Sequence, residues 1–169
     1  MSDGGTIRGE EPGDAAAIAD VLVDAFGGQA EARLVERLRT EHPDGYGPSL
    51  VAELDGAVVG HALLSRIGLA GRPDLGLLAL APVGVLPTCH GLGIGSALVR
   101  RALELATDPV VVVGEPSWYR RLGFEPAAPS GLVPPWPDVG DAWMVWFPEG
   151  VDGAPYRGQV VYPAPFAEV

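Results

Sequence analysis

The chain has 169 residues and a formal net charge of −11, and 47% of its residues are hydrophobic. This length suits one domain with a sizeable core, while the acidic balance argues against a nucleic-acid partner. A single cysteine, Cys89, excludes an internal disulfide framework. We expect a cytoplasmic protein, because the sequence shows neither a secretory signal nor an apolar run of membrane-spanning length.

The first third of the chain predicts a strand, two helices and a hairpin. Residues 6–8 favour a short strand, and Asp14 is typical of a helix N-cap because apolar residues follow it at helical spacing. Residues 30–38 repeat that spacing and predict a second helix. An Asp-Gly pair then joins predicted strands over residues 50–54 and 57–67, which indicates a β-hairpin.

The middle of the chain predicts a β-α-β unit. Residues 77–85 are almost wholly apolar, as expected of a central strand that is covered on both faces. A helical pattern over residues 94–106 and a β-branched strand over residues 110–113 follow it. Because this order combines an antiparallel hairpin with a β-α-β unit, we expect an α/β fold with a sheet of mixed direction.

The last third carries weaker signals. Residues 117–122 predict a short helix with Ser117 as its cap. Residues 126–139 are rich in proline and favour an ordered loop, and residues 142–147 predict a last strand. The tail that follows carries several aromatic side chains, so we expect it to pack on the body of a single domain over residues 1–169.

A glycine-rich turn links the predicted central strand to the helix after it. It reads His90-Gly91-Leu92-Gly93-Ile94-Gly95-Ser96. Glycines let backbone N–H groups converge on an anion, and the helix dipole adds roughly half a positive charge at the same point. The turn therefore predicts a cradle for a pyrophosphate group.

Two common phosphate-binding patterns do not fit this turn. The Walker A pattern needs a lysine, which the chain lacks, and the dinucleotide fingerprint needs a glycine where Ser96 stands. A third pattern, Gln/Arg-x-x-Gly-x-Gly/Ala, fits at Gly93 and Gly95. The chain departs from it only at the first position, which is His90.

A second motif lies one β-α step downstream, where Tyr119 is followed by Gly123-Phe124 in the pattern Tyr-x-x-x-Gly-Phe. With the glycine turn, it resembles the GNAT acetyltransferases. Three further segments resemble the YhbS-type branch of that family: Gly60-His61, residues 114–119 and Gly158-x-Val-x-Tyr162. The resemblance implies a mixed, mostly antiparallel central sheet flanked by helices, in which a splayed strand pair forms a cleft for acetyl-CoA.

The resemblance also implies which residues bind acetyl-CoA as co-substrate. A backbone N–H near Val83 would face the thioester oxygen, and Tyr119 would protonate the leaving thiolate. The implied cofactor-binding residues are Val83, Gly84, Val85, His90, Gly91, Leu92, Gly93, Ile94, Gly95, Ser96, Pro116 and Tyr119.

The base that takes the proton of the amine is left open. Many members of the family carry a glutamate in the fourth strand, but residues 77–85 contain no acid. Four side chains are candidates for the base or for a partner in a water relay: Glu53, His61, Glu115 and Glu125. The alternatives are a water relay alone or no base at all. We expect Cys89 to be incidental and the tryptophans to line the core or a substrate pocket.

The function that the resemblance implies is transfer of an acetyl group from acetyl-CoA to a primary amine, by direct attack in a ternary complex. The acceptor would be a small amine, an amino acid derivative or a peptide N-terminus. One alternative is a non-catalytic module that binds acyl-CoA as a sensor or interaction platform, and another is a different nucleotide or phosphate ligand. We expect no membrane partner, because no apolar run reaches membrane-spanning length. We also expect no metal, because the three histidines lack ligand spacing. A homodimer is one assembly that the sequence leaves open.

Overall fold

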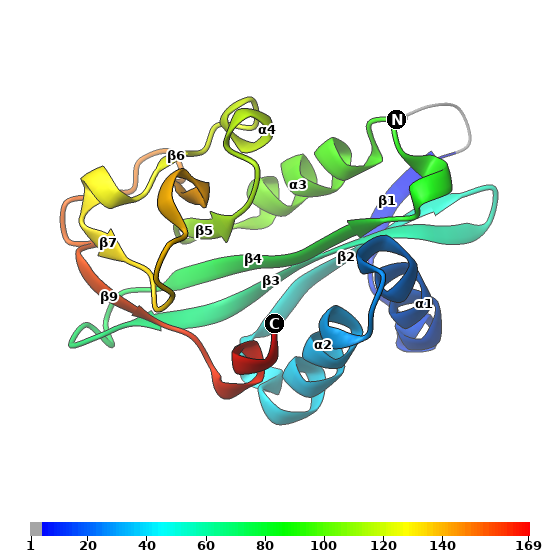
Figure 1. The fold of residues 1–169 in the computed structure, drawn as a ribbon, viewed down its shortest axis with the longest axis horizontal. Helices are drawn as coiled ribbons and strands as arrows, with labels where there is room; N and C mark the ends of the chain where they lie inside the picture. The colour runs from blue at the N-terminus through cyan, green and yellow to red at the C-terminus, as the bar shows by residue number, and fades with distance from the viewer. Residues whose placement is uncertain (1–4) are drawn as a thin grey trace.

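The computed structural model describes residues 5–169, and its strands form a mixed sheet that is mostly antiparallel (Figure 1). The main path of the sheet runs β1-β2-β3-β4-β5-β8-β6, and β9 pairs with both β3 and β7. The pairs β4–β5 and β7–β9 are the parallel ones. The strands are β1 (Gly5–Gly9), β2 (Tyr46–Leu54), β3 (Ala57–Leu69), β4 (Leu77–Val85), β5 (Val110–Val113), β6 (Glu125–Pro126), β7 (Leu132–Val133), β8 (Trp143–Trp146) and β9 (Gly158–Val161).

Helices cover both faces of this sheet (Figure 1). The pair α1 and α2 packs on one face, and α3 and α4 lie on the other. Their bounds are α1 (Ala15–Phe26), α2 (Ala30–Glu41), α3 (Ile94–Leu105) and α4 (Pro116–Arg120). Within residues 5–169, no helix combines the length and apolar content needed to cross a membrane. The predicted α/β fold, with a mostly antiparallel sheet flanked by helices, is confirmed.

Each face of the sheet has its own buried core. On the first face, Ile18 and Leu22 of α1 pack with Leu38 of α2 and the strands. On the second face, Leu98 and Ala102 of α3 pack in a separate cluster. The i, i+4 spacing of these side chains places each pair on one stripe of its helix. The central strands are therefore covered on both sides, as their apolar composition predicts.

Two glycines let the helices approach the sheet closely. A Cβ at Gly84 in β4 would lie 2.9 Å from the Leu22 side chain of α1, and one at Gly60 in β3 would lie 3.0 Å from the Leu98 side chain of α3. The first contact is shorter than real Cβ atoms make and the second is at the tight end of their range, so a side chain at either site would require the facing leucine to shift. Gly84 therefore faces α1, on the side of the sheet opposite α3.

The strands β4 and β5 pair only at their beginnings. Leu78 pairs with Val110 and Ala79 with Val111, and no further pair follows. On the other edge of β4, Leu86 N–H donates to the Val59 carbonyl, which makes Val85 and Gly60 a non-hydrogen-bonded pair. Because backbone groups alternate along a strand, the N–H and C=O groups of Val83 and Val85 point away from β3, into the gap. The predicted splayed strand pair is thus present between β4 and β5.

Of the two predicted helix caps, Asp14 is confirmed in position and Ser117 is not. Asp14 occupies the N-cap position of α1, but its carboxylate makes no cap bond to that helix. It accepts instead from the Arg8 guanidinium at 2.7 and 3.0 Å and from the Glu11 N–H at 2.7 Å. For α4 the cap is Glu115, which accepts from the Ser117 N–H at 3.0 Å, so the prediction of Ser117 as the cap is wrong.

The proline-rich segment and the tail contain more structure than the sequence predicts. The segment includes the short strands β6 and β7 and a 3-10 turn over Ala128–Ser130. The tail packs on the body, as predicted, with Tyr156 and Phe166 buried. It also forms β9, a strand that the sequence analysis does not predict. Residues 1–4 of the predicted domain lie outside the described residues.

A buried histidine on β3 ends a polar chain that starts at the surface. His61 is 0% exposed, and a 2.9 Å hydrogen bond joins its Nε2 to Oγ of Ser49. Tyr46 lies next along the chain and donates to Glu10 at 2.6 Å, and Glu10 is paired with Arg39. Nδ1 of His61 has no partner among the described residues. Burial lowers the pKa of His61 to about 4, so the ring is neutral at pH 7.

We predict that His61 makes the fold less stable in acid. In the unfolded chain its pKa is about 6.5, so between pH 6.5 and 4 the unfolded state binds the proton first and the free energy of unfolding falls. The loss from pH 7 to pH 4.5 is about 2–3 kcal/mol from this group alone. Urea unfolding at both pH values should show that His61→Gln lacks this part of the loss. An equal loss in both proteins would contradict the assignment.

Candidate active site

A cleft of about 440 Å³ opens on the α3 face, beside the gap between β4 and β5. It is lined by Val83, Val85, Cys89, His90, Gly91, Gly93, Ile94, Gly95, Ser96, Trp118 and Tyr119. The structure therefore brings together nine residues of the predicted cofactor set. Gly84, Leu92 and Pro116 lie outside the lining: Gly84 faces α1, and Leu92 is 43% exposed.

The glycine turn leaves a run of backbone N–H groups without a described backbone acceptor at the start of α3. Gly91 and Gly93 have φ of +82° and +78°, values that side chains other than glycine rarely adopt. The first hydrogen bond of the helical turn runs from Ala97 N–H to the Gly93 carbonyl at 3.0 Å. No described backbone carbonyl accepts from the N–H groups of residues 91–96. Converging donors at a helix N-terminus are suited to an anion, as the sequence predicts.

His90 joins this turn to β4. Its Nε2–H donates to the carbonyl oxygen of Val85 at 3.0 Å. That carbonyl points into the gap between β4 and β5, so the imidazole occupies an acceptor that no described strand uses. The described lining of the cleft contains no arginine or lysine. The anion site consequently depends on backbone dipoles.

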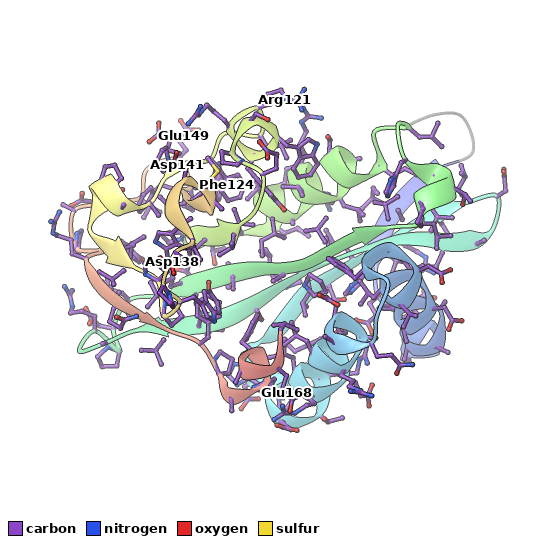
Figure 2. The ribbon with its side chains drawn as sticks, viewed as in Figure 1. Arg121, Phe124, Asp138, Asp141, Glu149 and Glu168 are labelled. Carbon is purple, nitrogen blue, oxygen red and sulfur yellow. The ribbon has the colours of Figure 1, made fainter. Side chains whose placement is uncertain are left out.

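Tyr119 reaches the cleft from α4. Its ring is 9% exposed and meets Trp118 and Phe124 edge to face, at centroid distances of 4.7 and 5.4 Å. Figure 2 shows Phe124 below α4, where the chain leaves this helix. Burial raises the pKa of Tyr119 to about 12, and its hydroxyl has no hydrogen-bond partner among the described residues. The hydroxyl is therefore protonated and available to a ligand in the cleft.

A glycine on the strand side makes room for the Tyr119 ring. A Cβ at Gly114, in the turn between β5 and α4, would lie 2.2 Å from Cε2 of Tyr119. Non-bonded carbon atoms do not approach this closely, so any side chain at Gly114 must displace the ring. Glu115 caps α4 directly after this glycine and fixes the start of the helix that carries Tyr119.

The four side chains considered as bases do not meet at the cleft. Glu53 accepts from Arg8 at the β1–β2 edge, and Glu125 is exposed on β6. His61 shares the face of Gly84, its cross-strand partner, and lies under α1. Glu115 is occupied by the Ser117 N–H and hydroxyl, which lower the pKa of this carboxyl. None of the four lines the cleft, so the structure brings no carboxylate to it.

A second cavity, of about 320 Å³, lies where β4 and β5 part; we call it the aromatic hollow. Three adjacent residues of each strand form its floor, and the proline-rich segment and the tail form its walls. The lining residues are Ala79, Leu80, Ala81, Val111, Val112, Val113, Trp136, Val139, Tyr162, Phe166 and Val169.

A third cavity, of about 830 Å³, lies at the β1 edge and contains none of the predicted site residues. Two of its arginines are already paired, Arg8 with Asp14 and Arg39 with Glu10. Within residues 5–169, no three ligating side chains gather in a way that could hold a metal ion.

Two residues of the cleft were not assigned a cofactor role from the sequence. Trp118 packs against the start of α3, with its ring 3.5 Å from the position of a Cβ at Gly95. Its place next to Tyr119 on a short helix is the sequence signal that could have identified it. Cys89 is buried at the base of the glycine turn, and its position one residue before His90 is the corresponding signal.

Comparisons with known proteins agree with this geometry. The model of the acetyltransferase (GNAT) family matches residues 15–124. The uncharacterized N-acetyltransferase YjhQ of Escherichia coli K12 is 34% identical over 148 residues, which are 84% of this chain and 82% of YjhQ. The uncharacterized N-acetyltransferase YhbS of the same strain is 37% identical over 145 residues, 82% of this chain and 84% of YhbS.

Solved structures give the same result. The crystal structure of YhbS from Escherichia coli in complex with CoA matches with a TM-score of 0.86 and 33% identity, covering 99% of this chain and 94% of that one. A GNAT family acetyltransferase from Brucella melitensis in complex with acetyl-CoA matches with a TM-score of 0.78 and 33% identity, covering 96% and 97%. The family model, the relatives and the fold together show that this chain belongs to the GNAT family of acetyltransferases.

Proposed function

We propose that the protein transfers the acetyl group of acetyl-CoA to a primary amine on a small molecule or peptide. The observation that carries this proposal is the cleft, in which unpaired donors of residues 91–96 lie beside the open edge of β4 and the Tyr119 hydroxyl. Support comes from YhbS and the Brucella melitensis acetyltransferase, which were crystallised with CoA and acetyl-CoA.

The cleft offers matching groups for each part of acetyl-CoA. The N–H groups of residues 91–96 would hold the diphosphate. The free C=O group of Val83 and the free N–H of Val85 would pair with the pantetheine amides, as an added strand does. The Val83 N–H would then face the thioester oxygen and stabilise the negative charge that develops there.

In the reaction, the nitrogen lone pair of the neutral amine attacks the thioester carbon. A C–N bond forms, the C–S bond breaks, and the sulfur leaves with the bonding electrons as a thiolate. The nitrogen, positively charged after the attack, releases one proton to water, and the thiolate takes up one proton, which gives the amide and the free thiol of CoA. Tyr119 donates a hydrogen bond to that sulfur. With a pKa near 12 against about 8.5 for a free thiol, complete proton transfer from Tyr119 is uphill by ~3.5 units, or ~5 kcal/mol. Burial also raises the pKa of a thiol, which narrows this difference.

We predict that Tyr119→Phe lowers kcat by ~10²–10⁴-fold, because the leaving thiolate loses its donor. The Kd for CoA should change little, since the ring and its packing remain. Thiol release under saturating acetyl-CoA measures the first quantity, and calorimetric titration measures the second. Tyr156→Phe, a buried hydroxyl deletion outside the cleft, is the matched control. An unchanged kcat in Tyr119→Phe would remove this residue from the mechanism.

We predict that Gly114→Ala lowers kcat by ~10–100-fold without removing any functional group. The new Cβ displaces the Tyr119 ring, and a displacement of about 1 Å at a reacting group can cost ~10²-fold. The same two assays report the effect. Gly28→Ala serves as control because a Cβ there meets no atom within 4 Å. Equal activity in both variants would show that Tyr119 need not hold its position.

A non-catalytic acyl-CoA-binding module is the second candidate, and the absence of any carboxylate from the described lining of the cleft favours it. Calorimetry with acetyl-CoA and thiol release against a panel of amines separate the two. Binding with turnover supports the acetyltransferase, binding without turnover on any amine supports the module, and no binding contradicts both.

A further inference from the structure

The aromatic hollow lies on the opposite face of the sheet from the cleft that would hold CoA. Its floor contains Ala81, Ala79 and Val111, which belong to the core cluster under α1 and α2, whereas Val83 and Val85 pack on the α3 side. Along β4 the order is Val85, Val83, then Ala81, a path of roughly 13 Å at ~3.3 Å per residue. An acyl group carried along this edge would end at the opening of the hollow. An acceptor bound in the hollow would approach the thioester from the face of the sheet opposite the cleft.

The walls of the hollow fit a flat apolar group. The rings of Trp136 and Tyr162 lie 4.6 Å apart at 54°, and those of Tyr162 and Phe166 lie 4.9 Å apart at 68°. The other lining residues are aliphatic. Burial raises the pKa of Tyr162, so this side chain is neutral as well. A volume of about 320 Å³ accommodates an aromatic ring with a short chain.

The same walls disfavour strongly basic amines. Within the described residues, no aspartate or glutamate side chain lines the hollow or the cleft, so no side-chain carboxylate is placed there to take a proton. Burial against apolar walls lowers the pKa of a bound amine. The pKa of the free amine must nevertheless be low enough for a large share of it to be neutral at the working pH. At pH 7.5 about a third of an α-amine of pKa ~7.8 is neutral, against ~0.1% of a lysine side chain. The neutral population therefore differs a few hundred-fold.

The hollow also disfavours a free carboxylate on the acceptor. Its described lining contains no arginine, lysine or histidine, and the chain carries a net charge of −11. A substrate carboxylate would thus be buried without a cation, which is costly. Asp138 is exposed on the loop that supplies Trp136 and Val139 (Figure 2) and adds negative charge there, which attracts a protonated amine in solution.

We infer that the acceptor is an α-amine with an aromatic side chain whose carboxyl is blocked as an amide, as in an aromatic amino acid amide or an N-terminal aromatic residue of a peptide. This inference rests on the proposed acetyl transfer. The aromatic ring occupies the hollow, against the wall formed by Trp136, Tyr162 and Phe166, and the α-amine faces the thioester where β4 and β5 part.

The test measures thiol release from saturating acetyl-CoA at pH 7.5 with four acceptors. Tryptophan amide should exceed alanine amide in kcat/KM by ~30-fold, the gain from burying an aromatic side chain. It should exceed Nα-acetyl-lysine amide, which offers only its ε-amine, by ~10²-fold or more. Free tryptophan should be poorer than its amide by at least ~10-fold, because of its unpaired carboxylate.

A pair of variants tests the position of the ring. Trp136→Ala should reduce the preference for tryptophan amide over alanine amide by ~10-fold, while the Kd for CoA stays within ~2-fold. Val161→Ala is the matched control, because Val161 is 50% exposed beside Tyr162 and does not line the hollow. It should keep the preference.

The outcomes separate this inference from the proposed function. If acetyl-CoA binds but no amine is acetylated, the proposed function fails and the inference with it. If alanine amide or the lysine derivative is the better acceptor, or if Trp136→Ala keeps the preference, the inference fails and acetyl transfer stands. If octanoyl-CoA is preferred over acetyl-CoA and Trp136→Ala abolishes that preference, the hollow holds the acyl chain, which also overturns the inference.

Discussion

The pairing of β4 with β5 ends at Ala79 and Val111, and the candidate site depends on that ending. Hydrogen-bonding groups of Val83 and Val85 are left facing a gap, although β4 lies in the middle of the sheet. Such groups need partners, so the gap is suited to a ligand that offers amides. The α3 face of the gap leads to the glycine turn, and the other face opens into the aromatic hollow.

The electrostatics of the site follow from the same arrangement. The chain carries a net charge of −11, and the cleft that fits an anion contains no arginine or lysine in its described lining. Attraction must therefore be local, through backbone N–H groups and the start of α3, because no arginine or lysine of the described lining contributes to it. Tyr119 is neutral because burial in apolar surroundings raises the pKa of its hydroxyl.

The sequence predicts the elements that local pattern determines. The bounds of β4 and β5 follow from runs of apolar and β-branched residues, and the glycine turn and the Tyr119 motif lead to the cleft. Alternation along a strand is a signal that could have separated Gly84 from Val83 and Val85, because neighbouring residues face opposite sides. The strand β9 could not be predicted in this way, since its four residues become a strand only through pairing with β3 and β7. Likewise, the hollow joins β4, β5, the proline-rich segment and the tail, which only the tertiary fold brings together.

Amide hydrogen exchange at Val83 and Val85, followed by NMR with and without acetyl-CoA, tests the central claim most directly. The open edge of β4 is proposed to receive the pantetheine as an added strand, so exchange at both amides should slow several-fold when the ligand binds, together with the amides of residues 91–96. Protection of residues 91–96 without any change at Val83 and Val85 would contradict the account, because the ligand would then occupy the glycine turn without entering the gap between β4 and β5.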